Sequence, residues 1–413
     1  MASFSIPLTG LEADTTALNT IANNLSNMST TSYKAQNVSF SDLFYQQIGD
    51  TGSGDPIQTG AGTQVSSIAT DYTQGSINST GTSTDVAIDG DGYFIVQNNG
   101  ATEYTRDGGF SLTTEGGLTT SSGGSVMGYP ATNGVVDTNA PLSPIVIPVG
   151  AVEQPNPTTS ISMTANLDSA AAVGTVVPDQ ITVYDSQGTS YTATVTYTKT
   201  ATNTWSYGIT LTNANGTAAA TSSTGNTGTL TFDANGNLLT PAANVTGINF
   251  SGLSDGAANL SLNWNLYPTA GGASTVTQVA SASTMATSDQ NGYASGEYQS
   301  FMVNSDGSIS VSFNNGQSTL VGQVALATVA NQQGLSRVGG NNYVTTLASG
   351  TASVGVAGAG GRGTLESGSL EQSNVNVSTE FSDLIVAQQA YEANSKAITT
   401  FDQVSQDTIN MIH

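Results

Sequence analysis

The chain ends in the sequence VSTEFSDLIVAQQAYEANSKAITTFDQVSQDTINMIH (residues 377–413), and this segment decides how the chain folds. It contains neither Gly nor Pro, so it predicts one helix of roughly 30 residues, about 45–50 Å long. Apolar side chains recur along it at the heptad spacing of a coiled-coil seam. They are Val377, Leu384, Tyr391 and Ile398 in one row and Phe401 in the companion row.

The start of the chain carries a second apolar stripe, over residues 8–28. Gly10 weakens its first turn and Asp14 interrupts one apolar row, so the repeat is short. The predicted helix would be roughly 30 Å long. Its apolar positions are Leu11, Leu18, Ile21, Leu25 and Met28.

These two predicted helices have no helical partner elsewhere in the sequence. Their stripes must therefore be buried against each other or against other copies of the chain. We expect the ten apolar residues named above to form an assembly interface, and so the sequence predicts an assembly subunit rather than an enzyme. The alternative is that each helix packs on a β core within one globular protein.

The interior of the chain is rich in Gly, Ser, Thr, Ala and Asn, and strand and turn signals alternate along it. A turn over residues 89–92 separates two short apolar runs and predicts a hairpin. The cleanest period-two alternation lies at about 150–275 and includes both Trp residues. We therefore predict a mainly β fold with terminal α-helices, in which antiparallel β domains are nested between coiled-coil-like helices.

This nested layout has four levels, and we assign each residue range to one of them. The levels are a terminal helical domain (1–30 and 372–413), an extended connector (31–75 and 348–371), a β domain (76–149 and 276–347) and an inserted outer β domain (150–275). The Gly- and Ser-rich parts of the connector, 49–62 and 348–368, are expected to be flexible. An aromatic cluster at 40–48 is expected to dock on something larger.

Composition excludes several functional classes. The net charge is −23 with only six basic residues, which argues against binding to nucleic acid or to an anionic membrane. The absence of Cys rules out disulfides, thiolate metal sites and Cys nucleophiles. No apolar run is long enough to span a membrane, so we expect no membrane insertion. The sequence starts without a conventional signal peptide, and export would need another route.

The residues that could carry chemistry have simpler explanations. The single His is the last residue, His413, where a catalytic triad or a metal site would have to use a frayed terminus. Residues 358–363 match GxGxxG but do not lie between a strand and a helix. The carboxylates at Asp85 and Asp89 fit turn chemistry better than glycoside hydrolysis. We expect no catalytic, cofactor-binding or metal-binding residue.

Several motifs, in order, resemble the bacterial flagellar axial proteins, the family of rod and hook subunits. They are residues 22–27 (ANNLSN) with Tyr33-Lys34, residues 85–88 (DVAI), residues 92–94 (GYF), residues 363–365 (GTL), residues 368–371 (GSLE), residues 373–375 (SNV) and residues 388–394 (QQAYEAN). Ser32 stands where the family usually has Gly. Residues 128–132 (GYPAT), residues 182–188 (TVYDSQG) and residues 320–324 (LVGQV) are most similar to hook subunits.

The resemblance implies a subunit that assembles with many copies of itself into the flagellar hook, a flexible tubular universal joint that transmits torque from motor to filament. It implies an extracellular location, export by the flagellar type III apparatus, and contacts with rod, hook-cap and hook–filament junction proteins. The terminal helices would line the inner tube. A distal rod subunit is the nearest alternative, and a secreted carbohydrate-binding adhesin is the alternative from another class.

Overall fold

The computed structural model describes residues 5–269 and 271–412, so the predictions for residues 1–4 and for His413 lie outside the described residues. The chain forms two compact units. The first contains the residues up to 149, residues 301–311 and the residues from 319 onward. The second contains residues 150–300 and 312–318.

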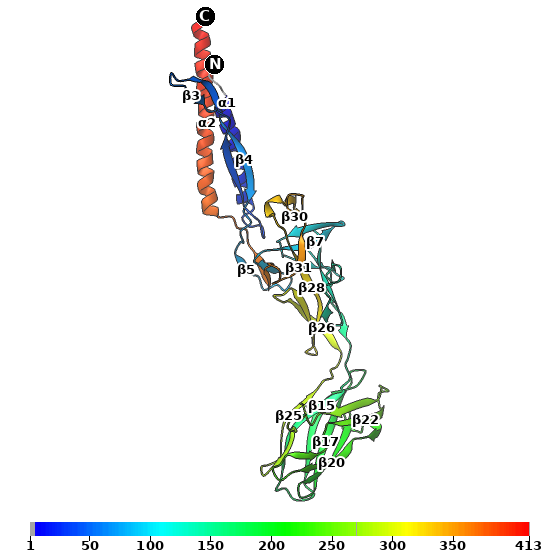
Figure 1. Ribbon diagram of the computed structural model, residues 1–413. Helices are drawn as coiled ribbons and strands as arrows, with labels where there is room; N and C mark the ends of the chain where they lie inside the picture. The colour runs from blue at the N-terminus through cyan, green and yellow to red at the C-terminus, as the bar shows by residue number, and fades with distance from the viewer. Residues whose placement is uncertain (1–4, 270, 413) are drawn as a thin grey trace. The chain divides into compact units, whose positions relative to one another are not determined.

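The predicted terminal helices are confirmed. α1 (Ser5–Ser26) and α2 (Val377–Ile412) lie side by side in the first unit (Figure 1). α1 is three residues longer at its start than expected and ends earlier, so Met28 lies in the turn that follows the helix and does not continue its stripe. Within the described residues, neither helix combines the length and apolarity needed to cross a membrane.

The rest of the first unit is made of short strands and one 3-10 turn, η1 (Gln332–Gly334). The strands are β1 (Gln36–Asp42), β2 (Gln46–Asp50), β3 (Pro56–Thr59), β4 (Thr63–Thr70), β5 (Ile77–Ser79), β6 (Val86–Asp89), β7 (Tyr93–Asn98), β8 (Ala101–Thr105), β9 (Ser111–Leu112), β10 (Leu118–Thr119), β11 (Ser125–Thr132), β12 (Val135–Val136), β13 (Ser143–Pro144), β28 (Ser318–Thr328), β29 (Ser336–Gly339), β30 (Asn342–Val344), β31 (Ser353–Val356), β32 (Thr364–Ser367) and β33 (Ser369–Glu371).

A central sheet organises this β region in the order β28-β11-β7-β8-β30-β29, and each neighbouring pair in it is antiparallel. Its apolar face buries Tyr93, Ile95 and Tyr343. The rings of Tyr93 and Tyr343 meet edge to face with centroids 5.8 Å apart, a favourable aromatic geometry. The early and late parts of the sequence thus share one core.

The predicted hairpin across residues 89–92 is wrong. β6 pairs with β32, Ile88 opposite Leu365, whereas β7 pairs with β8. The carbonyls of Ile88, Gly90 and Gly92 instead accept hydrogen bonds from the guanidinium of Arg106. The Arg106 side chain stabilises this turn, which connects β6 in one sheet to β7 in another. Period-two patterning cannot reveal a partner that is distant in the sequence.

The residues of the predicted connector form paired strands. Over 31–75 the chain forms a long antiparallel hairpin, in which β1 pairs with β4 and β2 with β3 near the tip. β1 and β4 both contact α1. Over 348–371, β31, β32 and β33 return to pair with β28, β6 and β5. The first segment is hydrogen-bonded within its own hairpin, and the second is hydrogen-bonded to strands elsewhere in the first unit. Their flexibility remains a prediction.

The second unit contains two sheets (Figure 1). Its strands are β14 (Val152–Glu153), β15 (Ser160–Asp168), β16 (Val176–Tyr184), β17 (Ser190–Ala201), β18 (Thr204–Thr212), β19 (Ala220–Thr224), β20 (Thr227–Phe232), β21 (Leu238–Thr240), β22 (Val245–Leu253), β23 (Leu260–Trp264), β24 (Val276–Val279) and β25 (Thr284–Gln290). β26 (Gly296–Val303) and β27 (Ser308–Phe313) carry the chain from one unit to the other.

These two sheets enclose one core around Trp205 and Trp264, both fully buried. One sheet has the order β16-β17-β18-β20-β21, and the other has β19-β22-β23-β15-β24 with β25 on β15. The unit extends to residue 300, beyond the boundary of 275 that we expected, because β25 pairs along β15. Two of its pairings, β15 with β23 and with β24, are parallel.

A carboxyl pair at one end of this core has unusual electrostatics. Asp185 is fully buried; its Oδ1 accepts hydrogen bonds from the backbone N–H groups of Gln187 and Thr189, and no group donates to its Oδ2. Burial raises the pKa of Asp185, and contact with Asp255 raises it further. The same contact lowers the pKa of Asp255. Neighbouring carboxylates cannot both ionise cheaply, so the titrations of Asp185 and Asp255 are linked.

Asp185→Asn should therefore flatten the pH dependence of the second unit's stability. Because the folded pKa of Asp185 lies above its unfolded value, the stabilisation it gives is complete below about pH 4 and is lost as the pH rises. The lowered pKa of Asp255 acts oppositely, since its stabilisation is lost as the pH falls below about 4. The amide introduced by Asp185→Asn would donate to Asp255 at every pH.

The measurement is urea unfolding of the full chain, followed by the fluorescence of Trp205 and Trp264, which both report on the second unit. Between about pH 4 and about pH 7, the unfolding midpoint of Asp185→Asn should change less than that of the wild type. Asp289→Asn, an exposed position in the same unit, is the control. Equal pH dependence in the wild type and Asp185→Asn would contradict a raised pKa of Asp185 in the folded state.

Candidate assembly interface

The polar interruptions of the two apolar stripes meet each other across the helix pair. Asn394 Nδ2 donates to Asp14 Oδ2 at 2.8 Å. Gly10 makes room for this contact, since a Cβ placed there would lie 2.7 Å from Asn394 Nδ2. A partly buried polar pair of this kind helps to specify register in helical assemblies. The residues that weaken each stripe in sequence therefore help to align the helices.

A second polar contact lies near the other end of the pair. Asn24, which is 1% exposed, donates from Nδ2 to Glu380 Oε1 at 2.9 Å and to the carbonyl of Gln36 at 2.8 Å. Gly10 and Asn24 are as far apart on α1 as Asn394 and Glu380 are on α2, and the order is reversed. The helices are therefore antiparallel and keep one register over about 20 Å.

None of the ten predicted interface residues is fully buried in the described structure. The exposed residues are Met28, Val377 and Tyr391, and the half-buried ones are Leu11, Leu18, Ile21, Leu25, Leu384, Ile398 and Phe401. Among the apolar side chains of the two helices, the smaller ones of Ala13 and Ala387 are buried. The heptad pattern placed Ala387 in the companion row with Phe401, whereas it did not indicate Ala13, because small residues carry little weight in such a pattern. Part of each large side chain remains available to another molecule.

Large apolar side chains are also exposed elsewhere on the helical part of the first unit. On α2 they are Phe381, Ile385, Val386, Val404, Ile409 and Met411. On the hairpin they are Phe40, Phe44, Tyr45, Ile48, Ile57 and Ile68, and Phe44 is 93% exposed. Soluble monomers rarely leave so many apolar groups in one region uncovered. This surface has the character of an unoccupied protein–protein interface.

α2 also extends past the start of α1. In the observed register Ser5 of α1 lies near residue 399 of α2, so residues 402–412 have no helical partner among the described residues. This overhang is roughly 17 Å long. It includes the exposed side chains of Val404, Ile409 and Met411. A helix of this composition needs a partner to be stable in water.

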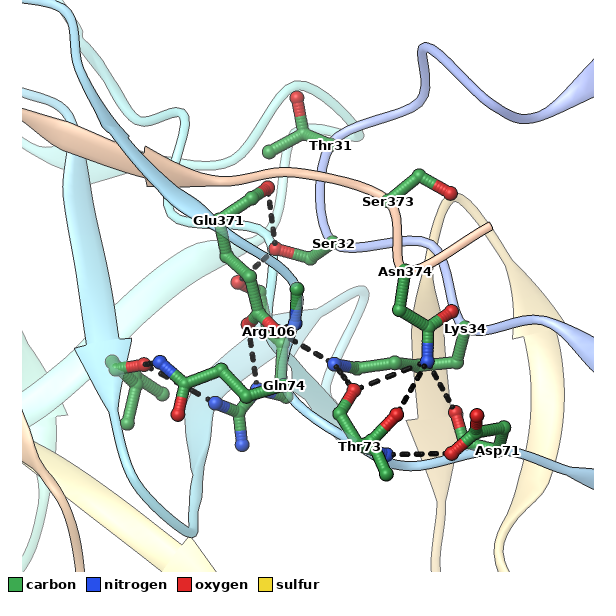
Figure 2. A network of polar contacts seen from close by, with 12 residues as sticks. Thr31, Ser32, Lys34, Asp71, Thr73, Gln74, Arg106, Glu371, Ser373 and Asn374 are labelled. Atoms are coloured by element: carbon green, nitrogen blue, oxygen red, sulfur yellow. Dashed lines mark hydrogen bonds and ion pairs between the residues drawn. The ribbon is translucent and has the colours of Figure 1, made fainter. Parts of the chain in front are cut away.

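A buried ion cluster fixes the helical part to the β region, and we call Lys34, Arg106 and Glu371 the junction cluster. Figure 2 shows Glu371 between the two cations. Its Oε1 lies 2.6 Å from Lys34 Nζ, and its Oε2 lies 2.9 Å from Arg106 Nε. The side chain of Glu371 is fully buried. Burial lowers the pKa of the Lys34 ammonium, and the Glu371 carboxylate opposes that effect.

The junction cluster binds the connections between helices and strands. Lys34 follows α1 and donates to the carbonyl of Thr73, which follows the hairpin (Figure 2). Glu371 precedes α2 and accepts a hydrogen bond from the backbone N–H of Gly75. Arg106 belongs to the β region and holds the turn at 88–92. One group of charges thus joins four separate parts of the chain.

Further contacts reinforce the same place. Arg337 donates from Nη2 to the carbonyl of Lys34 at 2.8 Å and lies over the rings of Tyr33 and Tyr343. The side chain of Asn374 donates to the carbonyl of Asp71. These bonds leave the chain between α1 and the β region with few free backbone groups.

Ser32 explains one departure from the family pattern. Its φ is +56°, in the left-handed region where Gly is favoured. The strain is offset locally: its backbone N–H donates to the carbonyl of Glu371 at 2.9 Å, and its Oγ donates to the carbonyl of Arg106 at 2.7 Å. Ser32 therefore belongs to the same junction.

The GxGxxG match has a structural explanation. Arg362 folds back over its own loop, donating to the carbonyls of Ala359 and Ser353. Among residues 5–269 and 271–412, no three His, Cys, Asp or Glu side chains converge as a metal site would require. The best candidate for a functional site in the described structure is thus the helix pair with its uncovered apolar faces. The buried junction cluster fixes this pair to the β region.

Four family models match successive parts of the chain. They are described as flagella basal body rod protein (residues 7–34), flagellar hook protein FlgE/F/G D1 domain (87–166), flagellar basal body protein FlaE D2 domain (177–293) and flagellar basal body rod FlgEFG protein C-terminal (366–411). Lys34, Arg106 and Glu371 each fall within a different one of these matches.

Similarity to individual proteins covers the whole chain. Flagellar hook protein FlgE of Salmonella typhimurium is 35% identical, over 99% of this chain and 100% of the relative. The Escherichia coli protein of the same name is 34% identical over the same shares. The crystal structure of Helicobacter pylori flagellar hook protein FlgE2 has a similar fold, with a TM-score of 0.52, 14% identity and coverage of 70% of this chain and 99% of that chain.

Gly10→Ala should weaken the helix pair. Ala stabilises an isolated helix by about 1 kcal/mol relative to Gly, but here its Cβ would displace Asn394 from Asp14. The helical circular dichroism signal of the full chain should unfold at lower urea concentration. Adding Asn394→Ala should relieve the clash and recover part of the loss. Asn19→Ala, exposed on α1, is the control, and a stability of Gly10→Ala at or above that of the wild type would contradict the close approach.

Glu371→Gln should destabilise the first unit strongly. It leaves the cations of Lys34 and Arg106 buried without their shared carboxylate, which typically costs about 3–5 kcal/mol. Hydrogen exchange in β6, β7 and β8 measures this loss within the full chain. Glu366→Gln, exposed on β32, should change the free energy of opening by less than about 0.5 kcal/mol. Similar exchange rates in the two variants would rule out a structural role for the junction cluster.

Proposed function

The chain belongs to the flagellar hook protein family and is a structural subunit of the bacterial flagellar hook, and we propose that its helix pair and hairpin form the inner wall of the hook tube. The observation that supports this most is the uncovered apolar surface on α2 and on the hairpin. Neighbouring copies would cover it, and burial of apolar area would drive polymerisation. This role requires no catalytic step.

The junction cluster would carry load between the tube wall and the β region. Torque applied to the helices must reach the β region through the chain segments near residues 34, 73 and 371. Lys34, Arg106 and Glu371 bind those segments to one another in a buried site. Buried, multiply bonded charges resist displacement because separating them leaves each charge unpaired. The connection would thus stay rigid while contacts between copies change as the tube bends.

The remaining partners would follow from the position of the hook. We expect the two ends of the tube to contact rod proteins and hook–filament junction proteins, and the growing end to contact the hook cap. Export would use the flagellar type III apparatus, and the assembled protein would be extracellular. The resemblance and the family membership support these expectations.

Deletion of residues 402–412 should abolish tube formation by the purified chain. The overhang has no helical partner among the described residues, so its removal should leave the β units intact and remove only contacts between copies. Electron microscopy in raised salt, which screens the repulsion between copies of net charge −23, provides the measurement. Trp fluorescence should be unchanged, as a control for folding. Ordered tubes formed by the truncated chain would contradict the proposed wall.

A further inference from the structure

We propose that Lys396 of one subunit binds an acidic groove on the helix pair of the neighbouring subunit. This inference rests on the proposed tube wall and names one of its contacts. The groove lies between α1, β1 and α2 and has a volume of about 290 Å³. Its acidic side chains are Asp14, Glu380 and Asp383.

The groove offers a surface for both the apolar stem and the charged end of a Lys side chain. Ile21, Val38 and Val386 provide apolar walls beside the three carboxyl groups. A Lys side chain has an apolar stem and a charged end, so it fits a cleft with this mixture of surfaces. Among the described residues, no basic side chain lines the groove.

The carboxyl groups of the groove lack a cation in the part of the chain that the structure describes. Burial raises the pKa of Glu380; the hydrogen bond from Asn24 opposes this, and the nearby charge of Asp383 adds to it. In the described contacts, Asp14 accepts a hydrogen bond only from the neutral side-chain amide of Asn394. A cation entering the groove would favour the ionised form of Glu380.

Among the described residues, only one basic side chain is free to supply that cation. Lys34 and Arg106 bind Glu371, and Arg337 binds the carbonyl of Lys34. Lys199 and Arg362 donate to backbone carbonyls close to them. In residues 5–269 and 271–412, the exposed ammonium of Lys396 has no hydrogen bond or ion pair. We therefore assign Lys396 as the side chain that a neighbouring copy places in the groove.

The spacing of Lys396 and Asp383 along α2 predicts how far neighbouring copies are displaced from each other along the helix axis. Lys396 lies thirteen residues beyond Asp383, which corresponds to about 20 Å along the helix axis. A neighbour displaced by that distance would place its Lys396 level with Asp383. The same displacement would bring the neighbour's overhang, residues 402–412, level with residues 389–399 of α2. One offset thus satisfies the groove and also covers the apolar overhang.

The test exchanges the two charges in the full chain. Lys396→Glu and Asp383→Lys should each raise the critical concentration for polymerisation about tenfold, because each places like charges together. The double variant Lys396→Glu with Asp383→Lys should return it close to the wild-type value. Glu392→Lys, on α2 outside the groove, adds the same charge as Asp383→Lys and should not rescue Lys396→Glu. Circular dichroism of each variant checks that folding is retained.

Three results would overturn the inference. They are polymerisation of Lys396→Glu at the wild-type critical concentration, failure of the double variant to recover, and equal rescue by Glu392→Lys. None of them would affect the proposed tube wall, because deletion of residues 402–412 tests that wall separately. Loss of rescue in high salt, where charge pairs are screened, would further support a direct contact.

Discussion

The antiparallel contact between α1 and α2 is the interaction on which the rest of the first unit depends. It brings the two ends of the chain together, and the segments next to each helix can then meet in one place. Lys34 follows α1, Glu371 precedes α2, and their ion pair is 2.6 Å long with both side chains buried. Without the helix pair, Lys34 and Glu371 would not be brought together, and the free-energy cost of removing each charge from water would not be offset by their pairing. Segments at opposite ends of the sequence are therefore neighbours in space.

Charge gives the molecule a second constraint. With a net charge of −23, copies of the chain repel one another, and two of the six basic side chains, Lys34 and Arg106, are bound to Glu371 inside the fold. Attraction between copies must come mainly from apolar surface, which is plentiful on α2 and the hairpin. Such surface is not directional and tolerates sliding, whereas hydrogen-bonded contacts within the subunit do not. This contrast suits a subunit that keeps its own shape while its neighbours shift.

Sequence patterning predicted the elements whose signal is local. The heptad rows of residues 377–413 were enough for α2, and alternation was enough for the strands around Trp205 and Trp264. It failed where the partner is distant: β6 pairs with β32 rather than with β7, and the hairpin of β1 and β4 is supported by α1. The site followed the same rule. Large apolar residues were found, but Asn24 and the junction cluster were not, since a lone charge does not indicate its partner. The only signal for Lys34 and Glu371 was their place in the family motifs.

The most direct test of this account is a helical reconstruction of the assembled tube by electron cryomicroscopy. α1 and α2 should form the innermost wall, with Asn394 beside Asp14 and with Phe381 and Ile385 covered by neighbouring copies. A tube held together by the second unit, with the apolar face of α2 still exposed to solvent, would contradict it.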